Sequence, residues 1–152
     1  KTLIETDSLL YIGRGLDYAL SMEGSLKLKE VSYIHSESYA AGELKHGTIS
    51  LIDEDVPVIA VATQTGIIPK TISNVVEVKS RGAKVILVCT DACARELKDG
   101  VADYVIEIPH TDELLMPITA VVPLQILAYY TSINRGIDPD KPKNLAKSVT
   151  VE

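Results

Sequence analysis

The sequence of 152 residues contains no tryptophan and no phenylalanine, and its only aromatic side chains are seven tyrosines. Hydrophobic residues still make up 46% of the chain, which is typical of a globular protein and argues against disorder. The core must therefore consist mainly of Ile, Leu, Val and Ala. This aliphatic composition favours a buried parallel β-sheet.

Basic clusters and long apolar runs are missing as well. The net charge of −6, with no grouping of Lys and Arg, argues against a nucleic-acid partner, because binding phosphates needs clustered positive charge. We find no apolar run of membrane-spanning length and no signal peptide, so we expect a cytoplasmic protein without membrane contact. The chain begins with Lys and enters a strand-like run almost at once, so we also expect it to be part of a longer protein.

Cysteine is nearly absent too. Cys89 and Cys93 are the only two, and no nearby histidine joins them in a metal-ligand set. In a chain without a secretory signal we expect them to be reduced thiols near a strand end. We therefore predict no metal site and no cofactor.

Apolar runs and amphipathic segments alternate along the chain, each bounded by turn residues. This rhythm predicts an α/β fold in which a doubly wound, mainly parallel sheet is flanked by helices, with residues 1–152 forming a single domain that ends in a tail at 144–152. The predicted strands are Ser8–Gly13, Pro57–Thr63, Lys84–Thr90 and Tyr104–Ile108, and the predicted helices are Gly15–Ser32, Glu37–Lys45, Ile67–Gly82, Ala92–Lys98 and Leu114–Asn134.

The predicted helix Gly15–Ser32 carries an unusual pattern of charge. At about 100° per residue, Leu16, Ala19, Leu20, Leu26 and Val31 share one arc, which we expect to be buried. Glu23, Lys27 and Glu30 project from the middle of the same arc, whereas a surface helix keeps its charges opposite its apolar side. Two interpretations stay open: a partly buried set of ion pairs, or the floor of a polar pocket with a carboxylate suited to proton transfer.

The turn before this helix reads Gly13-Arg14-Gly15. Two glycines around one arginine predict a tight strand-to-helix turn whose amide groups could face a ligand. The turn lacks the third glycine of a dinucleotide-binding loop, so it does not by itself indicate a nucleotide site.

Two stretches together point to a family. Glu23–Gly47, which follows Gly-Arg-Gly and reads EGSLKLKEVSYIHSESYAAGELKHG, resembles the isomerase half of glutamine–fructose-6-phosphate aminotransferases, also called glucosamine-6-phosphate synthases. The final residues KPKNLAKSVTVE resemble that family's C-terminal tail. The resemblance runs from about Leu9 to Glu152 and matches the second of the family's two sugar isomerase (SIS) domains.

The resemblance implies an enzyme and assigns roles to particular residues. The family transfers glutamine-derived ammonia to fructose 6-phosphate and isomerises the product to glucosamine 6-phosphate. Glu30 would be the base that moves a proton between C1 and C2, and Lys27 would assist at the sugar oxygens. His46, from a neighbouring subunit, would help to open the sugar ring. Lys147 would form a Schiff base with the open-chain ketose, and Glu23 and Ala146 would support substrate binding.

The resemblance also implies partners. These are a phosphosugar, a first SIS domain, a glutaminase domain and a second copy in a homodimer. Thr63–Gly66 lacks the Ser-x-Ser-Gly pattern expected of a phosphate loop, so we assign it no phosphate role and expect the isolated chain to be inactive. The alternatives are a non-catalytic phosphosugar-binding SIS module, and a stand-alone phosphosugar isomerase or deglycase. A catalytic lysine in the tail argues against the first of these.

Overall fold

The computed structural model describes residues 3–143. Five strands and four α-helices alternate along the chain, and two short 3-10 helices follow the second strand. The elements are β1 (Ser8–Gly13), α1 (Leu16–Ser32), β2 (His35–Ala40), η1 (Ala41–His46), η2 (Thr48–Leu51), β3 (Pro57–Ala62), α2 (Ile68–Lys79), β4 (Lys84–Thr90), α3 (Asp91–Glu96), β5 (Tyr104–Ile108) and α4 (Met116–Asn134).

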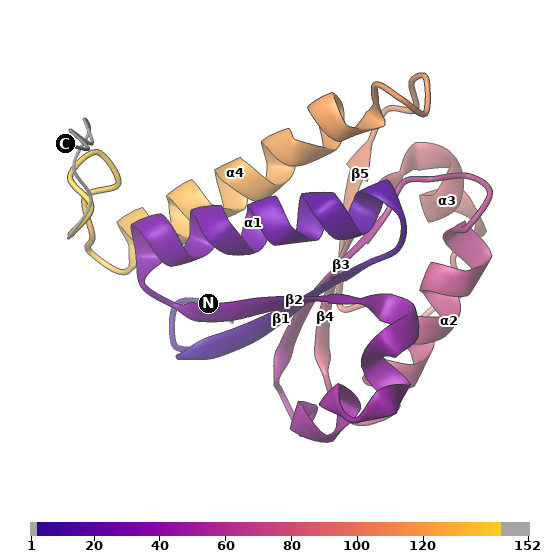
Figure 1. The fold of residues 1–152 in the computed structure, drawn as a ribbon, viewed down its shortest axis with the longest axis horizontal. Coiled ribbons are helices and arrows are strands. Elements are labelled where there is room, and N and C mark those ends of the chain that lie inside the picture. The colour runs from indigo at the N-terminus through magenta and orange to yellow at the C-terminus, as the bar shows by residue number, and fades with distance from the viewer. Residues whose placement is uncertain (1–2, 144–152) are drawn as a thin grey trace, which may run out of the picture.

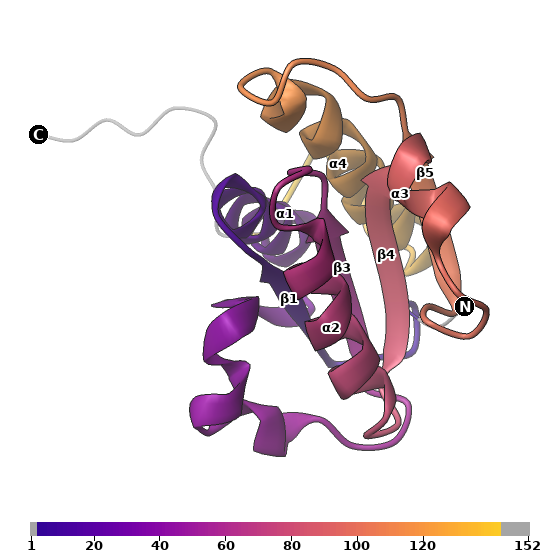
Figure 2. The same ribbon diagram turned by 90° about the vertical axis from the view of Figure 1, so that its right-hand side faces the viewer.

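The strands form one parallel sheet in the order β2-β1-β3-β4-β5. Helices α1 and α4 lie side by side on one face, and α2, α3 and the two 3-10 helices lie on the other (Figures 1 and 2). The predicted doubly wound α/β fold is thus confirmed. The chain leaves β1 towards β2 in one direction and reaches β3 on the other side, so the carboxyl ends of β1 and β3 flank the point where ligands commonly bind in such sheets.

The prediction of a helix over Glu37–Lys45 was wrong. Residues His35–Ala40 form strand β2, and the 3-10 helix Ala41–His46 follows it. The strand lies at the edge of the sheet and pairs only with β1, and Ser36 is its one buried residue. Because an edge strand needs little apolar surface, its sequence HSESYA lacks the alternation by which strands are usually recognised.

The buried side of α1 is also not the one predicted. Of the five residues expected to be buried, Leu20 is buried, Val31 is half-buried, and Leu16, Ala19 and Leu26 are exposed. The helix turns several small residues towards the sheet and α4 in their place. A Cβ added to Gly24 would lie 2.9 Å from the Tyr11 ring and 3.0 Å from Leu124, so α1 packs at close range only because this position is glycine. The buried residues of α1 are Asp17, Leu20, Ser21, Gly24, Ser25, Leu28 and Ser32.

Helix α4 corrects the expectation that no apolar segment is long enough to span a membrane. By length and composition alone it could cross a membrane, and it is the only helix within residues 3–143 that passes this test. In the structure, however, Met116, Ala120, Leu124 and Ala128 are buried in the core shared with α1 and the sheet. One side of α4 therefore packs in the core, whereas the other side, which includes Ile118, Val122 and Ile126, is exposed.

An ion-pair network at the start of β5 predicts a response to acid. Burial raises the pKa of Asp103, but hydrogen bonds from Lys79 Nζ, Val85 N and Lys84 outweigh it and hold the pKa at about 2. A carboxylate whose folded-state pKa lies below its unfolded value of about 4 stabilises the fold above that pH and loses this contribution as the pH falls to about 2.

We expect Asp103→Asn to lower the free energy of unfolding by about 1 kcal/mol at pH 7, after allowance for solvent screening. The difference between variant and wild type should disappear near pH 2. Urea denaturation of both proteins at several pH values measures it. A difference that stays constant with pH would contradict the assignment.

Candidate active site

Three charged side chains lie together on α1, as the sequence pattern predicted. Lys27 Nζ is 2.7 Å from Glu30 Oε2, with which it forms a hydrogen bond, and 3.7 Å from Glu23 Oε1. The three side chains are 30–40% exposed, so they lie on the flank of α1 and not on its buried side. The first interpretation from the sequence, a partly buried set of ion pairs, is the one that the structure confirms.

The surroundings of Lys27 favour its charged form. The hydrogen bond to Glu30 raises the pKa of Lys27, which burial opposes only in part, and the charges of both carboxylates raise it further. Lys27 is therefore a firmly protonated donor beside a carboxylate. Such a pair can accept a proton from carbon at Glu30 while the ammonium group stabilises negative charge on a neighbouring oxygen.

The helix that carries the triad Glu23, Lys27 and Glu30 is held rigidly against α4. Ser132 Oγ donates a 2.7 Å hydrogen bond to the carbonyl of Val31, next to Glu30 in sequence. Gly24 packs against Leu124 one residue after Glu23. Side chains on a braced helix are presented with little freedom of the backbone, which suits a catalytic group.

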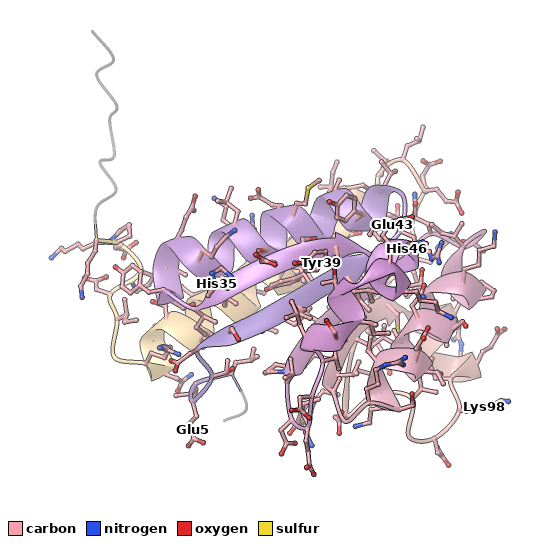
Figure 3. The ribbon with its side chains drawn as sticks, turned by 60° about the horizontal axis from the view of Figure 1, so that its bottom comes forward. Glu5, His35, Tyr39, Glu43, His46 and Lys98 are labelled. Atoms are coloured by element: carbon pink, nitrogen blue, oxygen red, sulfur yellow. The ribbon has the colours of Figure 1, made fainter. Side chains whose placement is uncertain are left out.

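His46 lies apart from this triad within the chain. It ends η1, its side chain is 76% exposed, and its Nε2 atom is 3.7 Å from Glu43 Oε2 (Figure 3). Among the described residues it forms no other ion pair. The chain itself therefore does not bring His46 to the α1 triad. Ala146 and Lys147 lie outside the described residues.

A buried carboxylate that sequence reasoning missed connects α1 to the loop after β3. Asp17 is 1% exposed and accepts hydrogen bonds from Thr63 N (2.8 Å), Thr63 Oγ1 (2.5 Å) and Gln64 N (3.3 Å). In return, Gln64 Oε1 accepts a bond from Leu16 N at the start of α1 (3.0 Å). Burial raises the pKa of Asp17, and these hydrogen bonds oppose the rise.

The position of Asp17 matters for ligand binding. It lies between the carboxyl ends of β1 and β3 and occupies the amides of Thr63 and Gln64, which could otherwise face an anion. This agrees with leaving Thr63–Gly66 without a phosphate role. The signal in the sequence was an acidic residue in the first turn of a predicted helix, where it is favourable next to free N–H groups.

No metal site is present within residues 3–143, since no three His, Cys, Asp or Glu side chains are placed to share an ion. Cys89 and Cys93 are buried free thiols, at the end of β4 and in α3. An apolar cavity of about 490 Å³ lies between α4 and β5, and it is lined by residues such as Ile106 and Tyr130 and by none of the triad. The candidate site is thus a charged surface on α1 that another part of a protein could complete.

Known proteins resemble this chain over nearly all of its length. A family model described as SIS domain matches residues 2–135. The glutamine–fructose-6-phosphate aminotransferase (isomerizing) of Clostridium perfringens is 57% identical over 144 residues, which cover 95% of this chain and 24% of that protein. The enzyme of the same name from Lactiplantibacillus plantarum is 57% identical over 150 residues, 99% of this chain and 24% of its own length.

A solved structure from a protein of the same kind is also similar to this chain. The C-terminal domain of glucosamine-fructose-6-phosphate aminotransferase from Francisella tularensis superimposes with a TM-score of 0.87 at 38% identity, covering 92% of this chain and 39% of that one. The chain spans about a quarter of the length of the curated relatives it matches. What it resembles is therefore one part of a larger protein.

Proposed function

This chain belongs to the SIS domain family, and we propose that it is the second sugar isomerase domain of a glutamine–fructose-6-phosphate aminotransferase. The larger enzyme makes glucosamine 6-phosphate from fructose 6-phosphate and glutamine-derived ammonia, and this domain supplies half of its isomerase site. The observation that carries the proposal is the Lys27–Glu30 pair, 2.7 Å apart on a rigid helix, in a chain 57% identical to enzymes of that name.

The geometry of the α1 triad suits the isomerisation step. Lys147 attacks the C2 carbonyl of the open-chain ketose, and the imine forms with loss of water. Ammonia attacks the imine carbon and displaces the Lys147 amine, which leaves an imine of ammonia at C2. Glu30 then removes a proton from C1 and returns it to C2, while the imine nitrogen gains a proton and the C1 hydroxyl loses one, so that the 2-amino aldose forms. Lys27 keeps its proton and stabilises negative charge on the sugar oxygens, and Glu23 holds Lys27 in place.

The remaining parts of the site come from elsewhere. We assign the phosphate of the sugar to the first SIS domain of the longer chain, because Asp17 fills the amide groups of the β3–α2 loop here. We assign ammonia production to a glutaminase domain. His46 is exposed and lies apart from the triad, which supports a role in the site of a neighbouring subunit of a homodimer. We expect the enzyme to act in the cytoplasm, and this domain alone to be inactive.

A test of the proposal is to trap the imine on Lys147. Borohydride delivers hydride to the imine carbon and leaves a stable secondary amine, so fructose 6-phosphate should become covalently attached to the peptide that contains Lys147 in the full-length protein. Mass spectrometry of the digested protein detects the added sugar.

A matched control is available in the same region. Lys143 has its ammonium group 5.5 Å from the centre of the Tyr33 ring, a place that needs no reactive amine. Lys147→Ala should abolish the attachment and Lys143→Ala should leave it intact. Attachment that survives Lys147→Ala, or none in the wild type, would favour a non-catalytic phosphosugar-binding module instead.

A further inference from the structure

Arg14, the centre of the Gly13-Arg14-Gly15 turn, has no role in the chemistry described so far. Its guanidinium group donates two hydrogen bonds to Asn74 Oδ1 of α2, from Nε at 3.0 Å and from Nη2 at 2.9 Å. Asn74 is itself buried. Within residues 3–143 no carboxylate forms an ion pair with Arg14. The arginine is thus held in one orientation by a buried amide.

The Nη1–Nη2 end of this guanidinium group lies against Gly42 in η1. A Cβ added to Gly42 would be 2.9 Å from Nη2, 3.0 Å from Nη1 and 3.1 Å from Cζ of Arg14. Both terminal nitrogens lie closer to this position than Cζ does, so the Nη1–Nη2 end of the group meets the glycine. Gly42 does not have a positive φ angle, so the arginine, not the backbone conformation, is the reason for glycine here.

Gly42 is the second residue of η1, the short segment Ala41–His46. Ala41 and Leu44 anchor this segment through their buried side chains, and Lys45 Nζ lies 3.0 Å from Glu77 Oε2 on α2. Lys45 is largely exposed in this pair, whereas the Glu77 side chain is only 20% exposed. The guanidinium of Arg14, which two hydrogen bonds hold to Asn74, meets the same segment at Gly42 and adds a directional contact that orients it.

We propose that Arg14 is a positioning residue: clamped by Asn74, it orients η1 and so aims His46 at the sugar site of the neighbouring subunit. This rests on the proposed function, in which His46 acts across the dimer. Arg14 does not touch the substrate. Its loss should therefore lower turnover and leave substrate binding almost unchanged.

In the full-length enzyme we expect Arg14→Ala to lower kcat by about 10- to 100-fold, the effect of a misplaced catalytic group, with KM nearly unchanged. Gly42→Ala should act in the same way, because its methyl group pushes η1 off the guanidinium. The double variant should be no worse than Arg14→Ala alone, since the methyl group then has room. Losses that multiply in the double variant would overturn the proposal.

Mixed dimers show in which subunit Arg14 acts. Two differently tagged chains, one Glu30→Gln and one Arg14→Ala, are co-expressed and purified as the mixed dimer. If Arg14 acts through His46 across the interface, both defects meet in one site, and the other site is intact. The mixed dimer should then recover about half of the wild-type activity, one working site of two. If Arg14 serves its own subunit, each site carries one defect and activity stays low, which would overturn the proposal.

A second mixture, Glu30→Gln with His46→Ala, separates this proposal from the function on which it rests. Recovery in the His46 mixture but not in the Arg14 mixture refutes the role of Arg14 alone. Failure of both mixtures refutes the shared site, and the positioning role falls with it. If Arg14→Ala does not fold, as judged by thermal melting, Gly42→Ala takes its place in the mixed dimer.

Discussion

The Glu30→Gln variant of the full-length enzyme should lose about 10²- to 10⁴-fold in kcat for the formation of glucosamine 6-phosphate, the range expected when a general base is removed. Gln keeps the size of the side chain, and its carbonyl oxygen can still accept the 2.7 Å hydrogen bond from Lys27. It cannot accept a proton from C1. The loss should therefore fall on the chemical step, with KM little changed.

The same variant gives a second, more direct signal. In deuterated water the wild-type enzyme should exchange the proton taken from C1 with solvent, so that deuterium appears at C2 of the product, because Glu30 shares its proton with water between the two transfers. Glu30→Gln should stop this exchange, which NMR of the sugar measures. Glu23→Gln is the matched control: it lies on the same helix, 3.7 Å from Lys27, and should keep exchange and lose less than about tenfold in kcat. Normal exchange in Glu30→Gln would remove Glu30 as the base.

Replacing Asp17 by Ala should lower the free energy of unfolding of this chain by about 2 to 4 kcal/mol, because three donors in a buried place lose their acceptor. The loop after β3 is then held to α1 only by the Gln64 side chain. Urea denaturation measures the change. The amide hydrogens of Thr63 and Gln64 should also exchange with solvent faster, which a general loss of stability would not confine to these two.

Asp91 provides the comparison for this variant. It too lies in the first turn of a helix, but its side chain is 44% exposed and its partner Arg95 is 3.2 Å away on the surface. Asp91→Ala should cost at most about 1 kcal/mol. Equal effects of the two variants would mean that the contacts of Asp17 add nothing beyond its place at the helix start.

Most strands and helices could be predicted, because their apolar patterns are local. Lys84–Thr90 and Tyr104–Ile108 have the predicted bounds, and the last helix ends at Asn134 as expected. The edge strand His35–Ala40 was missed because half of its surroundings is solvent, which leaves no alternating pattern. The family resemblance, carried by Glu23–Gly47 and the tail, was confirmed by relatives at 57% identity.

The candidate site was predicted only in part. The spacing of Glu23, Lys27 and Glu30 predicted that they meet, since residues three and four apart on a helix are neighbours. Three of the five residues expected on the buried side of α1, which are Leu16, Ala19 and Leu26, are exposed. The prediction placed apolar side chains inside where the structure places glycine and serine. The roles of Glu30, Lys27, His46, Lys147, Glu23 and Ala146 stay predictions.

The sequence by itself therefore determined most of the elements, the α/β class, the family and the charged triad, since all of these depend on residues near one another in the chain. Only the tertiary structure decided which side of α1 is buried, because that depends on how closely Gly24 lets the helix approach Tyr11 and Leu124. It alone joined Asp17 to Thr63, and Arg14 to Asn74. These pairs are 46 and 60 residues apart, and contacts over such distances arise from the winding of the sheet, which no local pattern records.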